Sequence, residues 1–177
     1  QLGSNAATGN ITVTTSEGTS NGVSFTVRSG NIYFVKTTGN DSSGNGSWDS
    51  PWRTIIKAKN SLAAGDIAYI CDGVSQTTLD NYNACVNLSS AGTADLPKAL
   101  VVYPGATVNV GSSSVNRGFY WWSGGLYWVL SQFNVTAGEV AFEWITGWRI
   151  VGNIITVPTG TGASAAIHGG YSYIKIL

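Results

Sequence analysis

Apolar and polar residues alternate in two short stretches near the start of the chain. Apolar side chains occupy every second position at 11–13 and again at 23–27, with a turn rich in Gly, Ser and Asn between them. A period of two on both sides of such a turn predicts a β-hairpin over residues 9–28 with one apolar face. Because an isolated hairpin is only marginally stable in water, we expect this face to pack against another surface.

The pattern then changes to a strand, a loop and a helical period. Residues 31–36 predict a strand, and residues 37–50 predict a loop of Gly, Asn, Ser and Asp. Apolar residues recur at helical spacing over positions 52–63, which predicts an amphipathic helix of about three to four turns. Ser50 and Pro51 are typical of its start, because serine caps free N–H groups and proline suits the first helical turn.

Short apolar strands recur after the helix at intervals that suit a solenoid. Residues 67–70 and 98–105 predict two of them. Three later segments align at steps of 20 and 26 residues, within the range of parallel solenoid repeats. Their residues fall into two columns, with Trp128, Trp148 and Ile174 in one, and Leu130, Ile150 and Ile176 in the other. We therefore predict stacked coils around a narrow apolar core.

The most recognisable pattern lies in two segments, IYFVKTTGNDSSGNGSWDSPWRTIIKAKNSLAAGDIAYICDG and GTADLPKALVVYPGATVNV. They resemble the beginning of a right-handed parallel β-helix of the pectate-lyase-like superfamily. In that family an amphipathic helix covers the N-terminal end of the solenoid, where the first coil would otherwise expose its core and a strand edge. The resemblance implies an all-β fold, a right-handed parallel β-helix with an N-terminal capping α-helix and a preceding β-hairpin.

The hairpin has a resemblance of its own. Its residues GNITVTTSEGTSNGVSFTVR are similar to the last two strands of an IPT/TIG domain, an immunoglobulin-like extracellular module. We therefore expect two parts, with residues 1–29 forming this hairpin and residues 30–177 forming the N-terminal coils of a β-helix. The chain closes on an apolar strand without a polar tail, so we expect the solenoid to be truncated at residue 177.

Charged residues are scarce, which narrows the class of protein. They make up 10% of the chain, with nine basic and nine acidic side chains, whereas about 25% is usual. This balance argues against a nucleic-acid partner, which requires a clustered basic surface. No apolar run reaches the roughly 18 residues of a membrane span. We expect an extracellular or cell-surface protein whose coils carry short polar side chains outside.

Two cysteines and five glycosylation sequons bear on the expected extracellular location. Cys71 and Cys85 predict a disulfide closing a loop of about 15 residues, worth about 3 kcal/mol, and two buried free thiols are the alternative. Neither cysteine has the spacing of a zinc site, and His168 is the sole histidine, so we predict no metal site. The Asn-X-Ser/Thr sequons, which are candidate glycosylation sites, are Asn10, Asn40, Asn45, Asn87 and Asn134.

Pectate lyases share the fold that the resemblance implies, and their chemistry requires a defined set of residues. Such β-elimination uses a Lys or Arg base and Ca²⁺ held by carboxylates. Lys175 and Arg149 are the candidate bases, at outward positions in consecutive coils. Glu139 and Glu143 are the only carboxylates after Asp95. This shortage of carboxylates favours a chain that is not an enzyme and needs no cofactor. If the chain is a lyase, we expect Ca²⁺ as its cofactor.

An aromatic cluster is the most unusual feature of the later coils. Residues 119–148 hold five of the seven tryptophans. Neighbours on a strand alternate faces, so adjacent Tyr120, Trp121 and Trp122 cannot all point inward. Together with Tyr127, they predict a surface that binds carbohydrate or a protein partner, whereas Trp128 and Trp148 are expected in the core.

These observations favour a non-catalytic extracellular or cell-surface module that acts in structure, fibre assembly or carbohydrate adhesion. Its partners would be a polysaccharide or other copies of itself, joined head to tail. One alternative is the N-terminal fragment of a secreted polysaccharide lyase of the pectate-lyase type. Another is a viral or surface fibre, because the fold alone does not choose between these roles.

Overall fold

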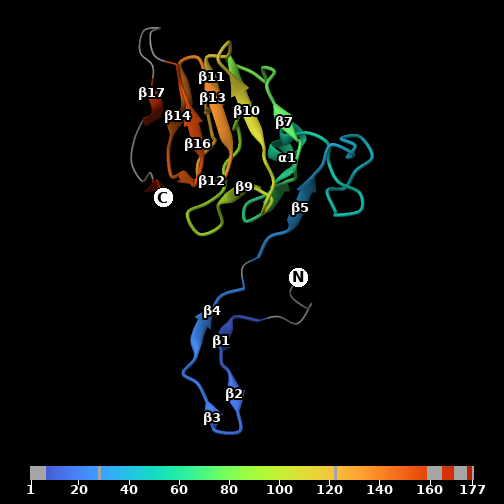
Figure 1. Ribbon diagram of the computed structural model, residues 1–177, viewed down its shortest axis with the longest axis vertical. Coiled ribbons are helices and arrows are strands. Elements are labelled where there is room, and N and C mark those ends of the chain that lie inside the picture. The colour runs from blue at the N-terminus through green and yellow to red at the C-terminus, as the bar shows by residue number, and fades with distance from the viewer. Residues whose placement is uncertain (1–6, 28, 122, 159–164, 170–174, 177) are drawn as a thin grey trace.

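The structure is a computed structural model dominated by stacked parallel strands (Figure 1). It describes residues 7–27, 29–121, 123–158, 165–169 and 175–176. The coils repeat the same turn of the chain, so strands far apart in sequence lie side by side in each sheet. The predicted fold, a right-handed parallel β-helix with an N-terminal capping α-helix and a preceding hairpin, is confirmed.

The described residues form three parallel sheets, to which each full coil contributes one strand apiece. The first sheet contains β5 (Ile32–Val35), β6 (Ile67–Ile70), β9 (Lys98–Val102), β12 (Trp128–Ser131), β15 (Arg149–Val151) and β18 (Lys175–Ile176). The second contains β7 (Ser75–Gln76), β10 (Asn109–Ser112), β13 (Asn134–Ala137) and β16 (Ile154–Thr156). The third contains β8 (Ala84–Asn87), β11 (Arg117–Tyr120), β14 (Val140–Ile145) and β17 (Ala165–Gly169).

The predicted alignment of the coils is confirmed along the first sheet. Leu130 pairs with Ile150, and Ile150 pairs with Ile176, in parallel register. The same register places Trp128 beside Trp148, and both rings are buried, at 1% and 0% exposure. Their indole N–H groups donate to backbone carbonyls, so the two large rings enter the core without an unpaired polar atom. Ile174 lies outside the described residues.

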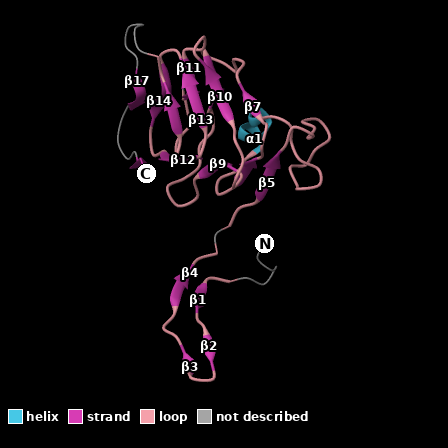
Figure 2. Ribbon diagram, in the orientation of Figure 1, coloured by secondary structure: helices cyan, strands magenta, loops and turns pink. Residues whose placement is uncertain are grey.

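The helix is shorter than predicted and begins later. Helix α1 spans Ile55–Ser61, next to β5 at the end of the stack (Figure 2). Its N-cap is Thr54, whose hydroxyl accepts a hydrogen bond from the backbone N–H of Lys57 at 3.0 Å. The carboxylate of Asp41 in turn accepts from the N–H and hydroxyl of Thr54, at 3.1 and 2.7 Å. This cap fixes where the helix starts.

Ser50 and Pro51 do not start the helix, because the next residue is already used by a strand. Trp52 forms an isolated parallel bridge with Val35. Its backbone N–H donates to the carbonyl of Phe34, and its own carbonyl accepts from Lys36. Because its N–H and its carbonyl are bonded to Phe34 and Lys36, Trp52 has an extended backbone. The helical spacing between Trp52 and Ile55 therefore predicted a helical backbone at Trp52 incorrectly.

The predicted hairpin is present and stands apart from the coils (Figure 1). Strand β1 (Gly9–Ile11) pairs with β4 (Val23–Phe25), and β2 (Thr14–Thr15) pairs with β3 (Gly18–Thr19), all antiparallel. Its apolar face is open, since Ile11, Val13 and Val23 are 57%, 65% and 71% exposed. The expected packing of this face is therefore not made within the described residues. The likeness to an IPT/TIG domain stays a prediction.

The predicted disulfide is wrong, because Cys71 and Cys85 are both free thiols. Cys71 directly follows β6 of the first sheet and is half-buried, whereas Cys85 lies buried within β8 of the third sheet. They lie 14 positions apart along the chain, but the coil places Cys71 at the end of a strand of the first sheet and Cys85 within the third. Burial raises the pKa of each thiol, since it disfavours the thiolate.

We expect the melting temperature to be the same with and without a reducing agent. A disulfide worth about 3 kcal/mol would instead shift the midpoint by roughly 6–12 °C on reduction. Thermal unfolding followed by circular dichroism measures this, and thiol titration in denaturant should count both cysteines without prior reduction. A midpoint that falls with reductant would contradict the free-thiol assignment.

Helix α1, the one helix among the described residues, has seven residues and is too short to span a bilayer.

Candidate functional site

The aromatic set predicted as a binding surface is largely enclosed. Tyr120 is 3% exposed and lies under the Arg117 guanidinium, 4.9 Å from its ring centre. Burial raises the pKa of the Tyr120 phenol, against the opposing effect of Arg117. Trp121 is half-buried against the core, and the half-buried ring of Tyr127 covers Gly147. Trp122 lies outside the described residues. The described members of this set therefore form no open platform.

A different group of aromatic side chains forms an open cleft over the first sheet. Phe34 of β5 and Tyr69 of β6 pair in register, and their rings stack at 6.0 Å. Tyr103 follows β9 directly and lies 5.9 Å from Tyr69. Trp48, from the loop before α1, lies 5.0 Å from Phe34 and 5.7 Å from Tyr103. We call these four residues the aromatic cleft.

The aromatic cleft is roomy and continues into a second recess. Together with Ile32, Ser47 and Pro104, its four rings line a hollow of about 600 Å³. A neighbouring recess of about 460 Å³ shares Trp48, Tyr103 and Pro104, so the two hollows are contiguous. The second recess adds a polar rim that includes Lys36, Thr37, Thr38 and Asp72. Apolar walls with a few placed polar groups are typical of a ligand site.

Trp48 is held in position rather than left free on the loop. The Lys36 ammonium donates to the backbone carbonyl of Trp48 at 2.8 Å and lies 3.2 Å from the centre of its ring. This is a cation–π contact, which stabilises the ring where it stands. Trp48 remains 47% exposed and Tyr103 38% exposed. Large apolar area is therefore presented to solvent in a fixed arrangement, which lowers the entropy that binding would cost.

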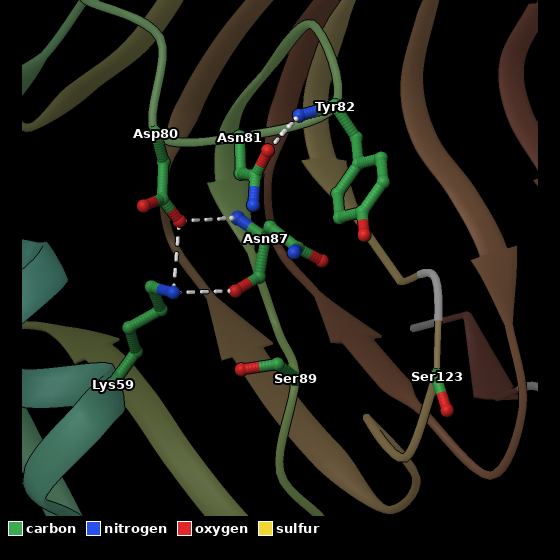
Figure 3. Close-up of a pocket in the computed structure, with 7 residues that line it drawn as sticks. All are labelled: Lys59, Asp80, Asn81, Tyr82, Asn87, Ser89 and Ser123. Carbon is green, nitrogen blue, oxygen red and sulfur yellow. Dashed lines mark hydrogen bonds and ion pairs between the residues drawn. The ribbon is translucent and has the colours of Figure 1, made fainter.

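A separate recess beside α1 is lined by residues of α1, β8 and two turns (Figure 3). The buried Lys59 ammonium pairs with Asp80 at 2.8 Å and donates to the backbone carbonyl of Asn87 at 2.6 Å. The same Asp80 carboxylate accepts from the backbone N–H of Asn87 at 3.0 Å. These three contacts connect α1 to the third sheet, and the residues that make them line one wall of the recess.

The third sheet also brings ionisable side chains together across neighbouring coils. Glu143 pairs in register with Tyr120 on one side and with His168 on the other. The Glu143 carboxylate forms an ion pair with Arg117, and it lies 3.5 Å from Nδ1 of His168. Sequence analysis missed this group. Only the register of the third sheet places residues 120, 143 and 168 side by side and brings the Arg117 side chain within reach of Glu143, and no clear repeat marks that register in the sequence.

The candidate bases Lys175 and Arg149 do share a column, since they pair directly between β15 and β18. Arg149 is exposed, and the side chain of Lys175 lies outside the described residues. In the described part of the chain, no three His, Cys, Asp or Glu side chains come close enough together to hold a metal ion. Catalysis by this pair stays a prediction.

The sequons differ in their access to solvent. Asn10, Asn40 and Asn45 are exposed, and half-buried Asn134 donates to the side chain of Asn109. Asn87 is only 5% exposed, and its backbone is bonded to Lys59 and Asp80. A glycan requires an accessible amide, so the fold contradicts the prediction at Asn87. Glycosylation at the other four positions stays a prediction.

These features define a parallel β-helix with an open aromatic cleft on its first sheet. No family model matches the sequence, and no curated protein matches it either. Among solved structures, the chain is similar to a rhamnogalacturonan lyase, at 22% identity and a TM-score of 0.49. The match covers 71% of this chain and 34% of the lyase, so the chain spans about a third of the length of that protein.

Proposed function

We propose that this chain is a non-catalytic, carbohydrate-binding β-helix module that acts outside the cell, and that the aromatic cleft holds a polysaccharide. One observation carries the proposal. Four aromatic rings from separate coils and a loop converge on one open hollow with a polar rim. Sugar rings present apolar C–H faces with hydroxyl groups at their edges, so a stacked aromatic floor beside polar side chains complements them.

The shape of the cleft favours a chain of sugars over a single one. The two contiguous hollows of about 600 and 460 Å³ extend the site past Trp48 and Tyr103, so more than one sugar ring could lie along it. The rim of the second recess carries one cation and one anion, Lys36 and Asp72, rather than a single sign of charge. This balance favours a polysaccharide of low charge density.

Replacing Trp48 with alanine is expected to weaken polysaccharide binding at least about tenfold, because central aromatic anchors supply most of the binding energy of such a site. Affinity electrophoresis in gels containing xylan, β-glucan, galactomannan or polygalacturonate measures this. The matched control is Trp144→Ala, which removes an indole that is 40% exposed on the third sheet. Retardation that survives in Trp48→Ala and disappears in Trp144→Ala would contradict the assignment of the cleft.

Incubation with the same polysaccharides, with and without Ca²⁺, separates binding from lysis. The proposal expects no rise in the ultraviolet absorbance of unsaturated products. A steady rise that depends on Ca²⁺ would support the alternative of a polysaccharide lyase and would contradict a non-catalytic role. Head-to-tail assembly of copies of the chain stays a prediction.

A further inference from the structure

The recess beside α1 contains a polar atom that the fold leaves unpaired. Oδ1 of Asn87 is buried and has no hydrogen-bond donor among the described residues. The whole residue is 5% exposed, and its side-chain amide points toward the space between Tyr82 and Ser123 (Figure 3). A buried acceptor without a partner costs free energy, so such an atom marks a place where a ligand donor fits.

The recess offers room and further polar groups around this acceptor. Its volume is about 290 Å³, whereas one water molecule occupies about 30 Å³ in the liquid. The side chains of Asn81, Ser89 and Ser123 also line it. Tyr82, 46% exposed, lies at its edge and offers an aromatic ring. This combination of hydroxyl and amide groups with one flat ring is suited to a sugar.

The turn that carries Tyr82 is strained and braced. Tyr82 and Asn83 adopt φ values of 53° and 55°, a left-handed backbone that side chains other than glycine rarely adopt. Asn81 accepts from the N–H of Tyr82 at 2.9 Å, and Arg117 donates to the Tyr82 carbonyl at 3.1 Å. Strain of this kind persists only where surrounding contacts impose it, and it occurs preferentially at binding sites.

Charge decides which ligand the recess accepts. The Lys59 ammonium is already matched by the Asp80 carboxylate at 2.8 Å, and the other lining residues carry no charge. An anionic ligand would therefore meet no excess positive charge. A cation would lie close to the Lys59 ammonium with no carboxylate of its own. The balance favours a neutral ligand that brings a hydroxyl donor for Asn87.

We propose that the recess between Asn87, Tyr82 and Ser123 binds a neutral sugar ring, with Oδ1 of Asn87 accepting one of its hydroxyl groups. This site shares no residue with the aromatic cleft. It therefore goes beyond the proposed function and does not depend on it. The recess would hold a single sugar ring, whereas the aromatic cleft would hold a polysaccharide.

Saturation-transfer NMR with the full chain and methyl glycosides of glucose, galactose, mannose and xylose tests this site. We expect at least one of them to bind with a dissociation constant on the order of 1 mM, which suits a ligand of this size. Asn87→Ala should weaken that binding at least about fivefold. Sodium galacturonate should bind more weakly than the neutral glycoside.

The control variants separate this site from the cleft. Asn87→Ala removes an Oδ1 that has no donor among the described residues, and Ser123→Leu fills the recess from its exposed rim. Both should weaken binding of the glycoside at least about fivefold, whereas Asn109→Ala, which removes an exposed amide on β10, and Trp48→Ala should leave it unchanged. The proposal is overturned if no neutral glycoside binds, if Asn87→Ala and Ser123→Leu leave binding unchanged, or if galacturonate binds more tightly. Loss in Trp48→Ala alone would assign the glycoside to the cleft, overturning this proposal while supporting the proposed function.

Discussion

Replacing Phe142 with alanine is expected to lower the free energy of unfolding by about 3–5 kcal/mol. The Phe142 ring is fully buried in β14 and stacks on Phe119 of the coil below, with ring centres 5.4 Å apart and planes 5° from parallel. Removing the ring leaves a cavity in the core. Because each coil of a solenoid contacts only its neighbours, coils further away cannot shift to fill that cavity. Urea unfolding followed by circular dichroism measures the change.

The matched control for Phe142 is Ile154→Ala in β16, where the side chain is 67% exposed. Its loss should change stability by no more than about 0.5 kcal/mol. If Phe142→Ala were as mild as Ile154→Ala, the third sheet would not be packed against the core as described.

Replacing Asp80 with alanine is expected to cost about 3–5 kcal/mol, because it leaves the buried ammonium of Lys59 without its carboxylate. The pair is 2.8 Å apart, with side chains only 6% and 16% exposed. Asp80 also accepts from the backbone N–H of Asn87, so the same change removes a hydrogen bond to β8 and leaves α1 joined to Asn87 through the Lys59 ammonium. Equilibrium denaturation of the variant gives the loss directly.

A double variant distinguishes the broken pair from a general loss of packing. Lys59→Met with Asp80→Leu removes both charges, and replacing a whole buried pair with apolar side chains is often nearly neutral. We expect this variant to recover most of the stability lost in Asp80→Ala. A double variant that is less stable than Asp80→Ala would contradict the assignment of the lost stability to the unpaired Lys59 ammonium.

The fold could be predicted because its signal is local and repeated. Leu130, Ile150 and Ile176 each follow an apolar alternation of period two, and the spacing of these segments fixes which residues pair. The start of α1 could not be predicted in the same way. Trp52 has helical spacing with the residues after it, but its backbone is bonded to β5, a contact that depends on residues 34–36.

The candidate site could not be predicted, because its residues meet only in the folded coil. The adjacent rings from Tyr120 onward are conspicuous in the sequence, yet Tyr120 is buried. Phe34, Tyr69 and Tyr103 lie in three separate segments of the sequence and come together through the register of β5, β6 and β9. The same distinction explains the cysteines, which are near in sequence but belong to different sheets.

Hydroxyl-radical footprinting read by mass spectrometry locates the polysaccharide site most directly. The experiment uses the full chain with and without the polysaccharide that binds best in the gel assay. We expect oxidation of Trp48 and Tyr103 to fall on binding, while oxidation of exposed Trp144 stays the same. Protection of Trp144 with no change at Trp48 and Tyr103 would contradict the assignment of the aromatic cleft as the carbohydrate site.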